Sequence, residues 1–107
     1  MGWADEHIQK LQNNEVVKFR PTGGSMSPLI NSGQLVTVAP CFTLTVRIDD
    51  IVLCEVNGKQ FLHKVHLIRD RDEGEKIPKY LIVNNKGGIN GWTPKTNVYG
   101  IVLHVED

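Results

Sequence analysis

One hydroxyl group in this sequence stands where nucleophilic chemistry is feasible. Ser25 follows Gly23 and Gly24, and Pro28 comes shortly after it. Glycines adopt backbone angles that other residues avoid, and proline fixes one dihedral angle. The stretch therefore predicts a stiff, accessible turn that presents the Ser25 hydroxyl. Because a serine hydroxyl is a poor nucleophile at neutral pH, it needs a base within hydrogen-bond reach and donors for a developing oxyanion.

Two neighbouring residues, His63 and Lys64, are the candidate bases for Ser25. Side chains alternate along a strand, so only one of the two can point toward the serine. An unperturbed histidine has a pKa near 6.5 and accepts a proton at neutral pH, whereas a lysine must first be strongly desolvated. This chemistry favours His63.

A β-hairpin is expected to carry both candidate bases. Residues 51–56 and 59–68 are strand-like and flank Asn57-Gly58, a pair that suits a two-residue turn with positive backbone angles. Such a turn predicts three cross-strand pairs, which are Val56–Lys59, Cys54–Phe61 and Val52–His63. His63 would then share the more apolar face of the hairpin, and Lys64 the other face.

The remaining pattern predicts a mainly β domain of about six to eight strands. Apolar spacing in residues 3–13 favours one short helix, so that residues 1–14 precede the sheet. Further strands are expected at residues 15–20, 35–38, 80–83 and 98–105, with a possible short one at 43–46. Residues 69–79 have mixed charges and predict a solvated loop, and residues 84–90 predict another loop.

Size and composition limit the classes of function. The 107 residues predict a single domain, 1–107, and the 12 basic and 12 acidic side chains cancel, which gives no electrostatic argument for nucleic-acid binding. The apolar runs are much shorter than the roughly 20 residues that cross a bilayer, so no membrane insertion is expected. Cys41 and Cys54 lack metal-ligand spacing and predict reduced thiols in a cytoplasmic protein, with a single disulfide between them as the alternative. No metal and no cofactor are expected.

Five short segments resemble the LexA-like repressors and type I signal peptidases, which are serine peptidases that share one β fold. Residues 24–30, Gly-Ser-Met-Ser-Pro-Leu-Ile, are similar to the nucleophile box of that family. Residues 50–52 resemble the start of a conserved strand, and residues 61–65, Phe-Leu-His-Lys-Val, resemble the strand that carries the general base. Residues 83–85 and 90–102 are similar to the family's Gly-Asp-Asn box and closing stretch.

The resemblance implies a coiled β-sheet or partly open barrel with Ser25 as the nucleophile. In this alignment His63 occupies the position of the base and Lys64 that of an arginine, as in family members that use histidine. A register shifted by one residue would instead imply a Ser25–Lys64 dyad.

Two departures from the family pattern affect the supporting residues. Asn84 stands where the family has an aspartate, which leaves at best an amide hydrogen bond to orient the base. Gly23 stands where some signal peptidases place an oxyanion-hole serine, so the Ser25 backbone N–H, alone or with Thr22, would serve. Gly23, Gly24 and Asn84 are therefore the expected oxyanion-hole and orienting residues.

Two classes of function follow. The first is a soluble serine endopeptidase that acts by acyl transfer on a peptide or protein substrate. The second is a non-catalytic regulatory module that binds an extended peptide or a twin subunit along a strand edge. Since repressor-type relatives pair through the C-terminal strand, the resemblance also implies a homodimer edge at residues 99–105.

Overall fold

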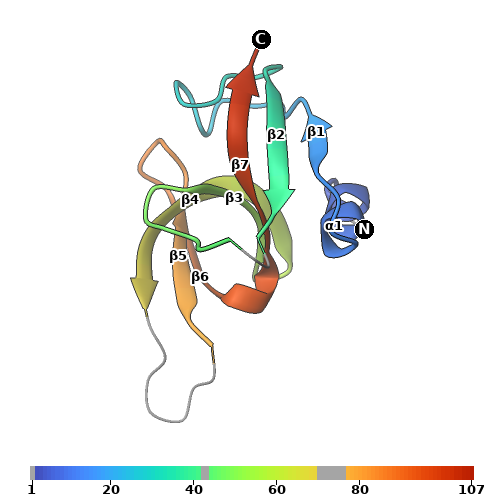
Figure 1. Ribbon diagram of the computed structural model, residues 1–107. Coiled ribbons are helices and arrows are strands. Elements are labelled where there is room, and N and C mark those ends of the chain that lie inside the picture. Colours follow the sequence, from blue (N-terminus) through green and yellow to red (C-terminus); the bar gives the residue numbers. More distant parts are fainter. Residues whose placement is uncertain (1, 42–43, 70–76) are drawn as a thin grey trace.

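The computed structural model describes residues 2–41, 44–69 and 77–107. Within these ranges the chain forms one seven-stranded antiparallel sheet in the order β1-β2-β7-β3-β4-β5-β6, together with a short helix (Figure 1). The elements in chain order are α1 (Asp5–Gln12), β1 (Val17–Phe19), β2 (Leu35–Pro40), β3 (Ile51–Val56), β4 (Lys59–Arg69), β5 (Lys79–Val83), β6 (Ile89–Pro94), the 3₁₀ turn η1 (Lys95–Asn97) and β7 (Val98–Glu106). The expected mainly β fold with one N-terminal helix is confirmed, and the sheet is open.

The hairpin of β3 and β4 has the predicted register. Val56 pairs with Lys59, Cys54 with Phe61 and Val52 with His63. Asn57 and Gly58 have φ angles of 50° and 82°, as the tight turn requires. The register places His63 on the same face of the hairpin as Val52, which is fully buried.

Both faces of this hairpin are covered, so it lies at the centre of the molecule. Leu53 and Leu62 belong to a core that also includes the inner side of α1, the strands β1 and β2, and two residues of the serine turn. Val52 and Val65 belong to a second core on the opposite face, formed with β5 and β7. The hairpin therefore connects the segment that carries Ser25 to the curled end of the sheet.

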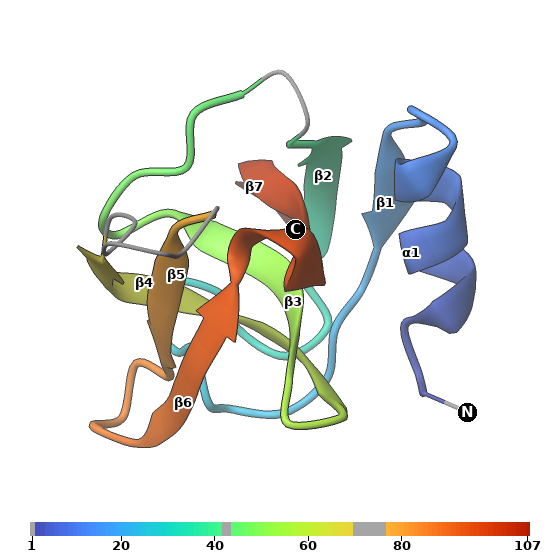
Figure 2. The same cartoon turned by 90° about the horizontal axis from the view of Figure 1, so that it is seen from below.

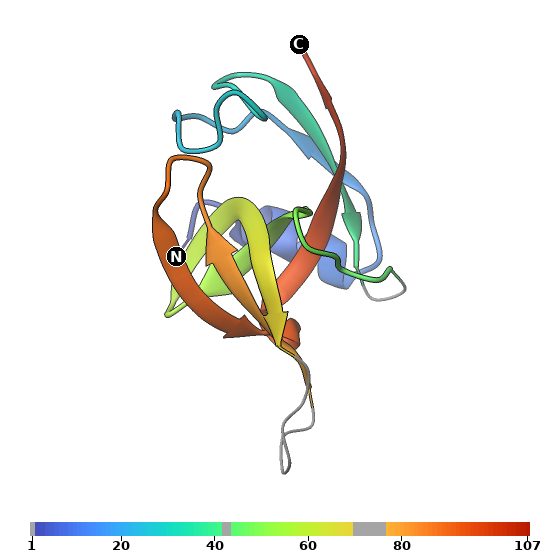
Figure 3. The same ribbon diagram turned by 90° about the vertical axis from the view of Figure 1, so that its left-hand side faces the viewer.

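The sheet curls strongly, with α1 and β1 at one end and β4, β5 and β6 at the other (Figure 2). This curl brings β6 back to β3, where the buried Thr93 hydroxyl donates a hydrogen bond of 2.6 Å to the Glu55 carbonyl oxygen. The turn between β5 and β6 also reaches the loop that contains Ser25 (Figure 3), because the Asn85 N–H donates to the Ser25 carbonyl oxygen at 2.8 Å.

Several expected element boundaries are wrong. The strand β6 occupies residues 89–94. The predicted loop ended at residue 90 and no strand was expected at residues 91–94, since Gly91 and Pro94 weaken the strand pattern there. Residues 44–46 form no strand, and residues 42–43 of that prediction lie outside the described residues. Most of the predicted charged loop, residues 70–76, also lies outside them.

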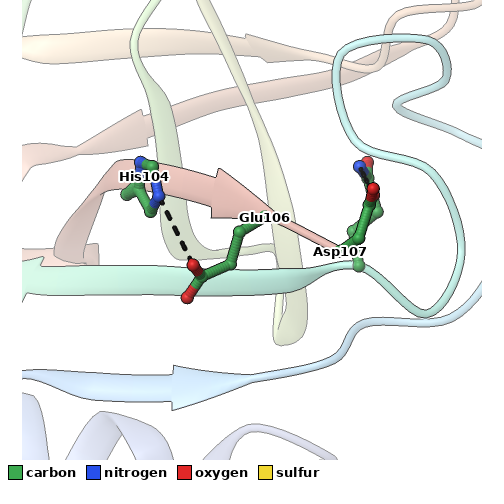
Figure 4. A network of polar contacts seen from close by, with 4 residues as sticks. His104, Glu106 and Asp107 are labelled. Carbon is green, nitrogen blue, oxygen red and sulfur yellow. Dashed lines mark hydrogen bonds and ion pairs between the residues drawn. The ribbon is translucent and has the colours of Figure 1, made fainter.

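The proposed dimer edge is only partly available. The strand β7 lies inside the sheet between β2 and β3, and β3 pairs with it from Val98 to Ile101. The first part of the expected edge is therefore occupied on both sides. Beyond Ile101 the described partner of β7 is β2 alone. There His104 lies 3.6 Å from the Glu106 carboxylate, and Asp107 accepts a hydrogen bond from Gln34 (Figure 4).

Candidate active site

Ser25 lies in a turn that is anchored by its apolar neighbours. Met26 and Ile30 are buried in the first core, while Ser25 itself is exposed. The Ile30 N–H donates to the Met26 carbonyl oxygen at 3.0 Å, and the Asn85 N–H holds the Ser25 carbonyl oxygen. The hydroxyl is thus accessible, whereas the backbone that carries it is fixed on two sides.

The Ser25 hydroxyl lies within hydrogen-bond distance of His63. The distance from Ser25 Oγ to His63 Nε2 is 3.1 Å, so the approach expected from the hairpin register is present. His63 is only 8 % exposed, and its ring stacks on that of Phe61, with centroids 4.9 Å apart and planes 22° apart. The imidazole is therefore held in one orientation by packing as well as by hydrogen bonds.

The second ring nitrogen of His63 is bound by Asn90. The distance from His63 Nδ1 to Asn90 Oδ1 is 2.7 Å. An amide oxygen only accepts hydrogen bonds, so Nδ1 carries the proton and donates it to Asn90. The tautomer with a free lone pair on Nε2 results, and this lone pair faces the Ser25 hydroxyl. The serine hydroxyl, the imidazole and the amide thus follow one another in the same order as the three groups of a hydrolytic triad.

Burial sets the protonation state of His63. Loss of solvent lowers the pKa of His63 from its usual value near 6.5, and the hydrogen bond to Asn90 has a smaller effect in the opposite direction. The ring is therefore neutral at pH 7 and available as a base. No further activation by a charged partner is required for that state.

A β-bulge directs Asn90 toward the ring. Ile82 pairs with Gly91 whereas Val83 pairs with Ile89, so Asn90 is the extra residue of β6. Gly91 has a φ of 131°, a value that side-chain-bearing residues rarely adopt. Bulges re-aim side chains near functional sites, and this one turns Asn90 toward β4 across the curled sheet. An Asn-Gly pair inside a strand is the only sequence signal for this arrangement, and it was missed.

The residue expected to orient His63 has another role. Asn84 Oδ1 accepts hydrogen bonds of 2.8 Å from both the Lys86 and the Gly88 N–H groups, which closes the turn between β5 and β6. The prediction that Asn84 orients the base is therefore wrong, and Asn90 holds the ring instead. Asparagine side chains often cap their own turn in this manner.

Lys64 lies on the other side of β4 from His63, as alternation requires. Its Nζ donates to Asn85 Oδ1 at 3.4 Å, and Asn85 Nδ2 in turn donates to the Ser27 carbonyl oxygen at 3.0 Å. Lys64 thus lies close to the serine turn but supports its backbone, while the Ser25 hydroxyl contacts His63 instead.

The two glycines before Ser25 differ in their roles. The N–H of Gly23 donates to Ser32 Oγ at 3.1 Å and is therefore occupied, and its φ of 101° makes the turn possible. Within the described residues, the N–H groups of Gly24 and Ser25 have no acceptor. These two donors are available for an oxyanion, while Thr22 contributes to the wall of the adjacent cleft.

Ser25 and His63 lie at one side of a cleft of about 510 Å³. The cleft runs from these residues past Phe61 and Leu62 to Trp3 and His7 near α1. A volume of this size falls in the range of sites that bind small molecules or short peptide segments. The reactive hydroxyl is therefore next to a space that holds more than a single side chain.

No family model matches the sequence, and a search of curated proteins finds no significant match. The described residues include no helix that is long and apolar enough to span a membrane. They also contain no group of three or more histidine, cysteine, aspartate or glutamate side chains arranged to hold a metal ion.

Proposed function

We propose that this protein is a serine endopeptidase of the kind represented by LexA-like repressors and signal peptidases. The observation that carries the proposal is the continuous chain from Ser25 Oγ through both nitrogens of His63 to Asn90. A neutral, oriented imidazole beside an exposed serine hydroxyl is the arrangement that activates a serine nucleophile.

In this proposal the Ser25 oxygen attacks a peptide carbonyl while its proton moves to His63 Nε2. The negative charge that forms on the carbonyl oxygen is stabilised by the free N–H groups of Gly24 and Ser25. The imidazolium then gives its proton to the leaving amine as the C–N bond breaks. Water then attacks the acyl-serine while the same ring takes its proton, and the imidazolium returns this proton to Ser25 Oγ as the bond between the acyl carbon and that oxygen breaks. Asn90 keeps Nδ1 protonated throughout.

The edge of β4 supports an extended peptide as the substrate. Lys59 and Val56 flank a two-residue turn and therefore form a hydrogen-bonded pair. Hydrogen-bonded and non-hydrogen-bonded pairs alternate along an antiparallel hairpin, so the N–H and carbonyl groups of residues 59, 61 and 63 point toward β3. Leu62 therefore directs its N–H and carbonyl toward the cleft, where pairing with β5 begins only at Lys64. An open donor and acceptor beside a nucleophile are the groups that hold a peptide in extended conformation.

A serine-directed fluorophosphonate probe tests the proposal. We expect it to add one label per wild-type chain, seen by intact-mass measurement, and to leave Ser25→Ala unlabelled. Ser27→Ala is a matched control on the same turn, because its hydroxyl bonds to Asn31 Oδ1 and is not part of the proposed machinery. Equal labelling of wild type and Ser25→Ala would reject Ser25 as the nucleophile.

The base is tested separately by two variants with a peptide mixture read out by mass spectrometry. We expect His63→Gln to lower kcat/KM by about 10²–10⁴, the usual contribution of a general base. Lys64→Met, which removes the alternative base, should retain most activity. If the reverse pattern is found, the Ser25–Lys64 dyad is correct. A folded wild type that neither reacts nor cleaves any peptide would leave a binding module as the function.

A further inference from the structure

The beginning of α1 is fixed to the strand that carries His63. The Trp3 indole N–H donates to the Gln60 carbonyl oxygen at 3.1 Å, and the Ala4 N–H donates to Gln60 Oε1 at 2.8 Å. Gln60 lies three positions before His63 on β4. These bonds make the helix start one end of the cleft that contains the proposed nucleophile.

Three rings line this end of the cleft. His7 stacks on Phe19, with ring centroids 4.2 Å apart and planes 18° apart, and Trp3 meets Phe19 edge-on at 5.8 Å. Trp3 remains 54 % exposed, although an indole ring is costly to leave in water. A ring that is exposed but held by a hydrogen bond loses little freedom when it binds an apolar group. Burial also lowers the pKa of His7, so this wall is uncharged at pH 7.

The hydrogen bonds of β4 determine how far a bound peptide extends. Trp3 already occupies the carbonyl of Gln60, and β5 pairs with Lys64, so Leu62 is the one open position between them. A peptide strand that pairs with Leu62 lies in the cleft whose lining includes both Ser25 and Trp3. Side chains alternate between the two faces of such a strand, so every second residue of the peptide is placed to contact the aromatic wall.

From this arrangement we infer that Trp3, His7 and Phe19 form a specificity subsite for a large apolar side chain, aromatic above all, at a peptide position removed from the scissile bond. The inference rests on the proposed function and adds a preference to it. Among the described residues that line the cleft, Arg20 is the only arginine, lysine, aspartate or glutamate, so no carboxylate is present there to bind a lysine or arginine side chain. The expected substrate is therefore apolar and not basic at this position.

The first test uses a library of peptides that differ at single positions. We expect the wild type to cleave peptides with Phe, Tyr, Trp or Leu at one position at least about tenfold faster in kcat/KM than the alanine peptide. Trp3→Ala should bring this ratio close to 1, mainly by raising KM for the peptides with a large apolar side chain. Trp3→Phe should restore part of the preference. Trp92→Ala is the matched control, since Trp92 is similarly exposed but lies on β6 outside the cleft.

The second test does not depend on catalysis. In the Ser25→Ala variant, millimolar N-acetyl-phenylalaninamide should shift the NMR signal of the Trp3 indole N–H and leave that of Trp92 in place. N-acetyl-alaninamide should shift neither signal. Phe19→Leu should weaken the Trp3 response while the backbone spectrum shows an intact fold.

The two tests separate the two proposals. A Trp3 response without any peptide cleavage supports the subsite and rejects the peptidase. The subsite is rejected and the peptidase is retained if the wild type cleaves peptides, Trp3→Ala has the same side-chain preference as the wild type, and N-acetyl-phenylalaninamide does not shift the Trp3 signal.

Discussion

The hydrogen bond between Asn90 and His63 allows a sharp test of the site. Replacing Asn90 by aspartate keeps the shape and the accepting oxygen but adds a negative charge 2.7 Å from His63 Nδ1. Asn90 is half-buried, so a carboxylate at this place retains part of its solvation. The charge stabilises the imidazolium and should raise the pKa of His63.

The size of the effect follows from the two kinds of hydrogen bond. A neutral bond contributes about 0.5–1.5 kcal/mol and a bond to a charged group about 1.5–3 kcal/mol, so the imidazolium gains about 1–2 kcal/mol. Since one pKa unit corresponds to about 1.4 kcal/mol, the pKa of His63 should rise by about one unit. Because an imidazolium also forms in the proposed transition state, kcat/KM at pH 8 should increase by up to about tenfold.

The assay is an NMR titration of the histidine ring protons in wild type, Asn90→Asp and Asn84→Asp. Asn84 is a matched control, because its side-chain oxygen bonds to the backbone of its own turn. The His63 signal should titrate at higher pH in Asn90→Asp and close to its wild-type pH in Asn84→Asp. Equal shifts in both variants, or none in a folded Asn90→Asp protein, would show that the amide of Asn90 does not hold the ring.

Three further predictions concern pH and stability. Since burial lowers the pKa of His63, the acid limb of kcat/KM should lie below pH 6.5. The unfolding free energy should fall as the pH drops through 6.5, because the unfolded chain then binds the proton more readily than the folded one. His63→Gln should weaken this fall in denaturant titrations. Gly23→Ala, at a φ of 101°, should destabilise the fold by about 1–2 kcal/mol, whereas Gly24→Ala, whose added Cβ meets open space, should cost less than about 0.5 kcal/mol in urea unfolding. Leu53→Ala, at a fully buried position, should cost about 2–5 kcal/mol by the same measurement, and the exposed Leu103→Ala less than about 0.5 kcal/mol; similar losses would contradict the central position of the hairpin.

The β3–β4 hairpin was predictable because its information is local. Asn57-Gly58 specifies the turn, the turn specifies the register, and the register places His63 on the opposite face from Lys64. The approach of Ser25 to His63 needed one further idea, the resemblance of the flanking residues to a serine peptidase family. Short-range rules and one resemblance were thus enough to pair two side chains that lie far apart in the chain.

The position of Asn90 was not predictable from the same rules, because it depends on the curl of the whole sheet. Sequence reasoning selected Asn84 because the resemblance aligns it with an aspartate of the serine peptidases, yet that side chain closes its own turn. A single extra residue in β6 then decides which asparagine faces the ring. Without the bulge, Val83 would pair with Asn90, and strand alternation would change the side to which the amide points.

Burial of His63 explains why a neutral amide suffices in place of a carboxylate. Burial has already lowered the pKa of His63, so the ring needs no help to remain unprotonated, only a partner that fixes its tautomer. An aspartate at this position would strengthen the base but would also add a charge beside a ring that is 8 % exposed. Asn90 holds the proton on Nδ1 without that charge, so we expect the acid limb of the proposed reaction to lie at low pH and the imidazolium of its transition state to be less stabilised. The rate gain and pKa rise expected for Asn90→Asp are therefore two results of one electrostatic change, and they should appear together.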